Sequence, residues 1–260
     1  MFVRSAAGSW WFRIVFTFVL MALIQPWFAA KLFFTGDEPH YLLSTLSFLH
    51  DGDFNLRNNY ELQHYREFGY TAGLNPQPQF GKTLKDELIP AEHGTIYPVF
   101  IAPAYALAGE MGVRWFQIMF AFLGCLLIGG AVDLLTGNRL IGSLSTVLLA
   151  LSPTWQMQAS RIYPDIFIGA SAALIIFFLA RQAARPDRRP AAYEGLAMGF
   201  LIVLMPVMYV KYGVLAAPLA LTAFSLRAFR MRPWLYAGAL VAFLVAALNL
   251  YFYGDQGALG

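Results

Sequence analysis

The stretch that decides the fold is residues 113–135, VRWFQIMFAFLGCLLIGGAVDLL, in which only Arg114 and Asp133 are charged. A helix needs roughly 20 predominantly apolar residues to cross a bilayer, and this stretch is long enough. The whole chain of 260 residues has the same character, because 58% of it is apolar and 13% is charged, with a mean hydropathy of +0.55. Soluble domains usually contain about 25% charged residues. The composition therefore excludes a disordered chain, argues against a soluble enzyme and predicts an all-α polytopic membrane protein.

Seven apolar segments are predicted to span the membrane. They lie near residues 10–34, 113–135, 140–155, 166–180, 195–209, 214–226 and 234–253. The first segment is also a candidate signal peptide, but it is longer than the 7–15-residue apolar core of such a peptide. In addition, Trp10 and Trp27 near its ends are typical of an interfacial belt. A further stretch, residues 97–108, is short, contains Pro98 and Pro103 and stops at a glycine, which favours an interfacial or re-entrant segment.

Arginine residues set the predicted orientation. If residues 97–108 do not cross, the arginines of the short connections fall on one side, which the positive-inside rule makes cytoplasmic. These residues are Arg4, Arg13, Arg139, Arg181, Arg185, Arg188, Arg189, Arg227, Arg230 and Arg232. We therefore predict a multi-pass protein of the cell membrane (inner or plasma membrane) with a cytoplasmic N-terminus and an extracytoplasmic C-terminus.

The predicted organisation is a single transmembrane domain over residues 1–260, without a separate soluble domain. Residues 35–112 form its long extracytoplasmic loop, which carries juxtamembrane helices. One of these is expected at about residues 41–49, ended by the turn that begins at Asp51. Loops of this length are usually functional, so the search for a site starts there.

Common catalytic and binding motifs are missing from the sequence. The one cysteine, Cys125, cannot form an internal disulfide, and no Cys/His spacing fits a zinc site. There is no dinucleotide fingerprint, P-loop, GxSxG or HExxH motif. The net charge of +3 is explained by membrane topology, so no nucleic-acid partner is expected. The small residues Gly124, Gly129 and Gly130 are expected to let helices pack closely.

Two adjacent acids, Asp37 and Glu38, follow the first predicted span in the stretch GDEPHY (residues 36–41). A carboxylate beside the hydrocarbon is costly unless it is paired or functional. Partial desolvation raises its pKa and makes it a better proton acceptor near neutral pH. The alternative is an acidic helix cap without a chemical role. His40 lies close to Glu38, whereas the other histidines show no metal-ligand spacing.

A third acid, Asp165, stands directly before the apolar segment 166–180 and follows Arg161 and Tyr163. It is either a helix start that complements the helix dipole or part of a site. The predicted topology places Asp165 and Asp37 on the same face at similar depth, which suggests a shared site.

Three basic residues on the same predicted side are candidate phosphate ligands. Lys211 ends the fifth predicted span, where it either extends its amine to the interface or holds a phosphate. Arg114 and Arg161 are comparable candidates.

In their order and sidedness these motifs resemble the GT-C superfamily of integral-membrane glycosyltransferases, and within it the branch of protein O-mannosyltransferases and aminoarabinose transferases (glycosyltransferase family 39-like). Residues 37–41 are similar to the DExxY-like opening of that branch. Residues 93–105, HGTIYPVFIAPAY, resemble the proline-rich segment before its second span. Residues 151–165 resemble its third-to-fourth-span connection, and residues 205–211 resemble its fifth span ending in Lys. The resemblance covers nearly the whole chain and implies the seven-span core module of the superfamily.

The resemblance implies an enzyme of cell-envelope glycosylation. It would move a sugar from a polyprenyl-phosphate donor to an acceptor hydroxyl at the extracytoplasmic face, with inversion. Asp37 would be the catalytic general base, and Glu38 or Asp165 would orient the acceptor or the base. The candidate substrate-binding residues are His40, Tyr41, His93, Arg114, Arg161, Tyr163 and Lys211.

The partners implied are the polyprenyl-phosphate-sugar lipid, membrane lipids, an unidentified acceptor and a possible partner subunit. The resemblance implies no definite cofactor, and the alternative of a divalent cation stays open, because neighbouring carboxylates are able to hold one through oxygen ligands.

Two other functions fit the same composition. A transporter or flippase of a lipid-linked or polar substrate also uses intramembrane acids and broken helices, but here the acids lie at span ends and no internal repeat is visible. A non-catalytic scaffold with a GT-C-like fold is the other, and the presence of Asp37, Glu38 and Asp165 on one side argues against it.

Overall fold

The computed structural model describes residues 3–29, 34–76, 81–82, 88–89, 94–226, 229 and 232–253. The helices are α1 (Val3–Ala29), α2 (Glu38–His50), α3 (Arg57–Glu61), α4 (Ile96–Thr136), α5 (Arg139–Leu151), α6 (Pro153–Ser160), α7 (Asp165–Ala183), α8 (Ala192–Met208), α9 (Gly213–Ser225) and α11 (Pro233–Tyr253), with short 3-10 turns η1 (His64–Arg66) and η2 (Val210–Tyr212). The only strands in the described part are β1 (Gly81–Lys82) and β2 (Leu88–Ile89), which pair antiparallel. The predicted all-α class is confirmed.

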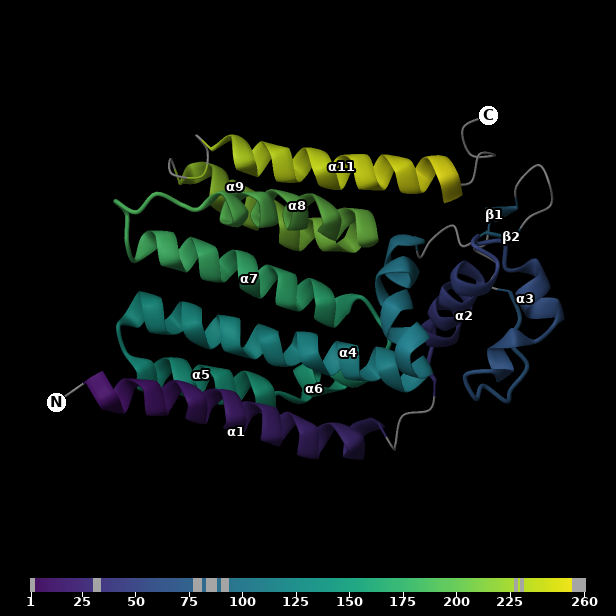
Figure 1. Cartoon of the computed structure of the whole chain (residues 1–260), viewed down its shortest axis with the longest axis horizontal. Coiled ribbons are helices and arrows are strands. Elements are labelled where there is room, and N and C mark those ends of the chain that lie inside the picture. The colour runs from purple at the N-terminus through teal and green to yellow at the C-terminus, as the bar shows by residue number, and fades with distance from the viewer. Residues whose placement is uncertain are drawn as a thin grey trace.

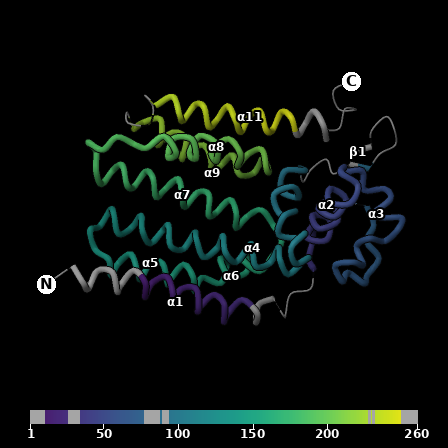
Figure 2. Tube along the Cα trace, in the orientation of Figure 1, coloured from purple at the N-terminus to yellow at the C-terminus, as the bar shows by residue number. Residues whose placement is uncertain are grey.

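The long helices lie side by side in a bundle, with α2, α3 and the β-pair gathered at one end of it (Figure 1). The start of α1, the turn between α4 and α5 and the loop between α7 and α8 lie at the opposite end, and the trace in Figure 2 follows the same course. Two neighbouring pairs, α8 with α11 and α4 with α7, make the most extensive contacts. The bundle therefore has two distinct ends, and both carry polar clusters.

Apolar surface covers much of the bundle. Two described helices, α4 and α7, are long and apolar enough to cross a membrane. Shorter apolar helices cover Trp11–Gln25, Arg139–Leu151, Ala192–Met208, Val210–Ser225 and Pro233–Leu248. Large apolar side chains on these helices point outward, among them Leu23, Leu148 and Leu221. Extended exposed apolar surface marks a membrane or protein contact rather than a water-facing wall.

Helix α4 is broken near its middle. Ala108 and Gly109 leave helical geometry, and Gly109 has φ +58°, a left-handed conformation that glycine adopts without strain. The part of α4 before the break lies across the end of the bundle, whereas the part after it runs along the bundle (Figure 1). The prediction that the segment 97–108 ends at Gly109 is confirmed.

The predicted small-residue contacts are also confirmed. A Cβ atom on Gly129 would overlap the hydroxyl of Thr146 on α5. A Cβ on Gly124 would lie 2.7 Å from the Trp155 ring, and one on Gly130 would lie 3.0 Å from the Phe177 ring. These glycines let α4 approach its neighbours closely, as small residues do in membrane bundles.

A buried ion pair joins three helices near the end of the bundle where α1 begins. Arg13 is 2% exposed, and its guanidinium lies 2.9 Å from the Asp133 carboxylate of α4. It also donates to the Ser143 hydroxyl of α5 at 3.1 Å. Arg13, one of the arginines that set the predicted orientation, thus has a packing role as well, which its position in the sequence does not reveal.

Candidate functional site

The candidate site begins at the turn that leads into α2. Glu38 is 1% exposed, and its carboxylate accepts from the backbone N–H of Thr35 at 2.8 Å and of Ile162 at 2.7 Å. Charge-assisted bonds of this kind are stronger than neutral ones. Glu38 therefore ties the turn to the connection between α6 and α7. Its hydrogen-bond partners, Thr35 and Ile162, hold the backbone, so Glu38 is a positioning residue.

Tyr163 closes the same turn from the other side. Its hydroxyl donates to the carbonyl of Thr35 at 2.9 Å and accepts from the backbone N–H of Asp37 at 2.9 Å. Gly36, between them, has φ +55°, and a Cβ atom there would lie 2.5 Å from the Tyr163 hydroxyl. Both the backbone conformation and the space therefore require glycine at position 36.

A residue of α4, Gln117, binds the segment that carries Tyr163. The side-chain amide of Gln117 donates to the Tyr163 carbonyl at 2.6 Å and contacts the Tyr97 hydroxyl at 2.6 Å. Gln117 is buried, and buried polar groups that are fully paired fix a local geometry. The α6–α7 connection is therefore anchored at two points, and Asp165 follows it at the start of α7.

Asp37 and Asp165 both act electrostatically on the hydroxyl of Tyr41. Tyr41 is buried, with its ring edge-on to Tyr97 and Tyr163 at centroid distances of 5.0 and 5.9 Å. Burial raises the pKa of its hydroxyl, and the carboxylates of Asp37 and Asp165 raise it further. The hydroxyl therefore stays protonated near neutral pH and lies within electrostatic range of both acids. That Asp37 and Asp165 share one site stays a prediction.

Lys211 adds a positive charge to the acidic cluster, by which we mean Asp37, Asp165 and the tyrosines Tyr41 and Tyr163. Its amine lies 3.3 Å from the Asp165 carboxylate and 5.0 Å above the rings of both Tyr209 and Tyr212. The Lys211 side chain is 54% exposed, so the amine is held in place and still open to a ligand. Cation–π contacts of this type position a charge without neutralising it.

Arg161 and Arg114 differ in what they bind. The Nε of Arg161 is buried and has no hydrogen-bond partner in the described part of the chain. Its positive charge lowers the pKa of the Tyr163 hydroxyl, although burial raises that pKa overall. Arg114 instead pairs with Glu110 at 2.6 Å and donates to the Ser160 carbonyl at 2.6 Å. Arg161 therefore has a hydrogen-bond donor available to an anion, whereas the Arg114 guanidinium already binds two groups of the protein.

The histidines lie outside the acidic cluster or outside the described residues. His40 is buried on α2, and its Nδ1 lies 2.6 Å from the Tyr60 hydroxyl. This contact joins α2 to α3 and has the character of a structural hydrogen bond. His93 falls outside the described residues. The described residues contain no group of three or more His, Cys, Asp or Glu side chains placed to hold a metal ion.

Several residues of the cluster were not among the sequence candidates. Tyr209 and Tyr212 flank Lys211, and Gln117 anchors Tyr163. Tyrosines that flank a lysine at a span end are a usable signal, because an amine near an interface favours aromatic neighbours. Nothing in the sequence around Gln117 marks it.

Comparison with protein-family models, curated proteins and solved structures finds no match for this chain.

Proposed function

We propose that the chain is an integral-membrane glycosyltransferase of the GT-C type, which takes a sugar from a polyprenyl-phosphate donor at the extracytoplasmic face. In this proposal seven helical units span the membrane: α1, the part of α4 after Gly109, α5 together with α6, α7, α8, α9 and α11. The end of the bundle with α2 faces outward. The end with the α4–α5 turn and the α7–α8 loop faces the cytoplasm, as the arginines there favour.

The observation that carries the proposal is the convergence of Asp37, Asp165 and Lys211 on one end of the bundle. Asp37 and Asp165 both act on the hydroxyl of Tyr41, and Lys211 pairs with Asp165. Two acids and a partly exposed amine at one predicted membrane interface supply a proton acceptor and a phosphate ligand at the same end of the bundle. A glycosyl transfer from a lipid phosphate needs both.

In the proposed reaction Asp37 accepts the proton of the acceptor hydroxyl. The acceptor oxygen forms a bond to the anomeric carbon while the bond from that carbon to the phosphate oxygen breaks, which inverts the configuration. The electron pair of the broken bond leaves with the polyprenyl phosphate, whose negative charge Lys211 and Arg161 stabilise. Asp165 positions Lys211, and Glu38 holds the turn that carries Asp37.

The other sequence candidates take positioning roles in this proposal. Tyr163 fixes the backbone of Asp37, and Tyr41 offers a neutral hydroxyl between the two acids. Arg114 holds the Ser160 carbonyl ahead of the α6–α7 connection. No step of the proposal uses a metal ion.

The proposal is tested with purified protein in liposomes and a panel of radiolabelled polyprenyl-phosphate sugars. We expect release or transfer of the sugar by the wild type and a loss of at least roughly 10²-fold in Asp37→Asn, because general-base catalysis contributes about that much. Glu61→Gln is the matched control, since Glu61 is an exposed carboxylate on α3 in the same loop, and it should retain the wild-type rate. Donor binding without turnover would favour the scaffold, and no donor binding at all would favour a transporter or scaffold.

A further inference from the structure

A cavity lies at the opposite end of the bundle from Asp37. Its volume is about 570 Å³, and it is formed by the last turns of α4 and α7 and the first residue of α5. Its lining residues are Gly130, Asp133, Leu134, Gly137, Arg139, Phe177, Arg181 and Arg185. Sites for small ligands typically measure about 300–1,000 Å³, so the cavity can hold a headgroup.

The charge of the lining is strongly positive. The acidic group of the lining, Asp133, is already paired with the buried Arg13. One of the three arginines, Arg181, is paired with Glu194 at 2.8 Å. The carboxylates next to the cavity are therefore used within the protein, and the remaining positive charge has no acidic counterpart in the lining.

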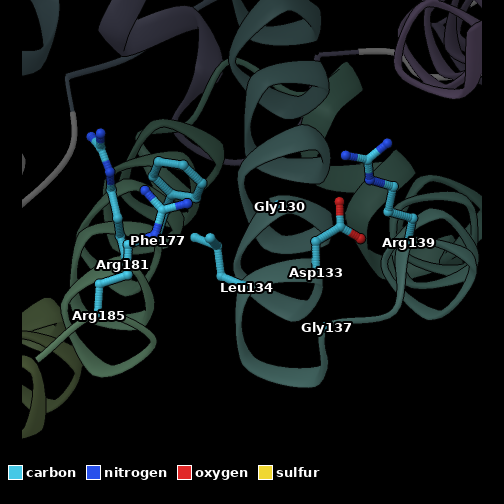
Figure 3. Close-up of a pocket in the computed structure, with 8 residues that line it drawn as sticks. All are labelled: Gly130, Asp133, Leu134, Gly137, Arg139, Phe177, Arg181 and Arg185. Carbon is cyan, nitrogen blue, oxygen red and sulfur yellow. The ribbon is translucent and has the colours of Figure 1, made fainter. Parts of the chain in front are cut away.

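Two of the arginines are available to a ligand. The guanidinium groups of Arg139 and Arg185 form no hydrogen bond or ion pair with the residues that the structure describes, and both residues are exposed. Figure 3 shows Arg185 with Phe177 on one side of α4 and Arg139 with Asp133 on the other side. Each of these exposed guanidiniums is able to donate charge-assisted hydrogen bonds to a phosphate oxygen from its side of the cavity.

The cavity also has an apolar wall. Leu134 and Phe177 line it together with Gly130. A free phosphate ion gains nothing from such a wall, whereas the glycerol and first methylenes of a lipid bury apolar area against it. The combination of an arginine rim and an apolar wall therefore selects an amphiphile over a soluble anion.

We propose that this cavity binds the phosphate headgroup of an anionic membrane phospholipid in the leaflet opposite the candidate active site. Under the orientation described above this is the cytoplasmic leaflet, whose anionic lipids attract basic residues near the membrane surface. The inference depends on membrane insertion and is independent of sugar transfer, so either proposal can fail while the other holds.

The test uses delipidated full-length protein in a neutral detergent, with phosphatidylglycerol and phosphatidylcholine as probes and native mass spectrometry as the readout. We expect phosphatidylglycerol to bind at least roughly tenfold more tightly than phosphatidylcholine. The double variant Arg139→Gln/Arg185→Gln should lose roughly 10- to 30-fold, since each basic residue contributes about a fivefold factor. Both side chains are exposed, so the variant should elute and unfold as the wild type does.

Two controls separate the cavity from general surface charge. Arg189→Gln removes an exposed arginine of the same loop that does not line the cavity, and it should change the affinity less than twofold. Arg139→Lys/Arg185→Lys should recover most of the binding lost in the glutamine variant, because the charges return. Equal losses in Arg189→Gln and in the double variant would overturn the site, as would equal binding of the two lipids.

A soluble competitor distinguishes a lipid from a free phosphate. Glycerophosphoglycerol carries the same headgroup without acyl chains, and we expect it to compete at least tenfold more weakly than phosphatidylglycerol. Competition as strong as that of the intact lipid would refute the lipid assignment, because the apolar wall would then contribute nothing.

Discussion

Replacing Gly36 by alanine tests the way in which the α2 turn is held. The new Cβ atom would lie 2.5 Å from the Tyr163 hydroxyl, at a backbone φ of +55°. Since the backbone is fixed by Glu38 on one side, the tyrosine hydroxyl has to move. It would then lose its bonds to the Thr35 carbonyl and the Asp37 N–H.

The expected cost has two parts. An alanine in the left-handed region costs roughly 1–2 kcal/mol, and the two lost hydrogen bonds cost about 1 kcal/mol each. Gly36→Ala should therefore lower the free energy of unfolding by roughly 3–4 kcal/mol. Tyr163→Phe alone loses the same two bonds and should cost about 2 kcal/mol. In the Tyr163→Phe background the clash is gone, so Gly36→Ala should cost only the backbone strain, roughly 1–2 kcal/mol.

The assay is equilibrium unfolding of the four proteins of this double-mutant cycle in mixed micelles. Gly69→Ala is the matched control, because Gly69 has φ +80° and a Cβ atom there meets nothing within 4 Å. It should cost roughly 1–2 kcal/mol in both backgrounds. Additive effects of Gly36→Ala and Tyr163→Phe, within about 0.5 kcal/mol, would refute the reasoning, because the two residues would then not share one contact.

Three further predictions follow from the same cluster. Glu38→Gln keeps one oxygen as an acceptor and places an amide donor against one of the two backbone N–H groups that Glu38 binds. It should therefore lower the free energy of unfolding by about 1–3 kcal/mol, measured in the same micelles; a change under about 0.5 kcal/mol would contradict its role. Since the pKa of Tyr41 is raised in the folded state, only the unfolded chain ionises this tyrosine just above pH 10, so stability should fall as the pH rises from there. In Tyr41→Phe the free energy of unfolding should fall less steeply with pH above about 10. An unchanged slope would be evidence against the burial of the hydroxyl. Lys211→Met should raise KM for the donor roughly tenfold or more, as loss of one charge-assisted phosphate contact does. The half-exposed ion pair of Lys211 with Asp165 contributes at most about 1 kcal/mol to stability, so the variant should fold. An unchanged KM would show that Lys211 does not bind the phosphate.

Local patterns predicted several helices. The seven predicted spans are not confirmed, since two described helices are long and apolar enough to cross a membrane and the predicted span 140–155 is divided into α5 and α6. The helix expected at about residues 41–49 is α2, the break at Gly109 divides α4, and the small residues of α4 make the close contacts expected of them. These features depend on neighbours in the sequence or on the size of one side chain. That is why periodicity, turn residues and glycine positions are enough to find them.

The site was only partly predictable because its contacts are distant in sequence. Asp37 and Tyr163 are 126 residues apart, and nothing near either one shows that a tyrosine hydroxyl will hold the aspartate backbone. For the same reason the sequence could not show that Glu38, expected to orient the acceptor or the base, binds the backbone N–H of Ile162 instead. Arg114 likewise donates to the carbonyl of Ser160, which is 46 residues away in the sequence, in addition to its ion pair with Glu110.

The most direct measurement of the central claim is the single-turnover rate of sugar transfer, in the same liposomes, by the wild type and Asp37→Asn, with the anomeric configuration of the product read by NMR. We expect a product of inverted configuration from the wild type and a rate at least roughly 10²-fold lower in the variant. Equal rates in the two proteins, or a product of retained configuration, would contradict the assignment of Asp37 as the base of a direct displacement.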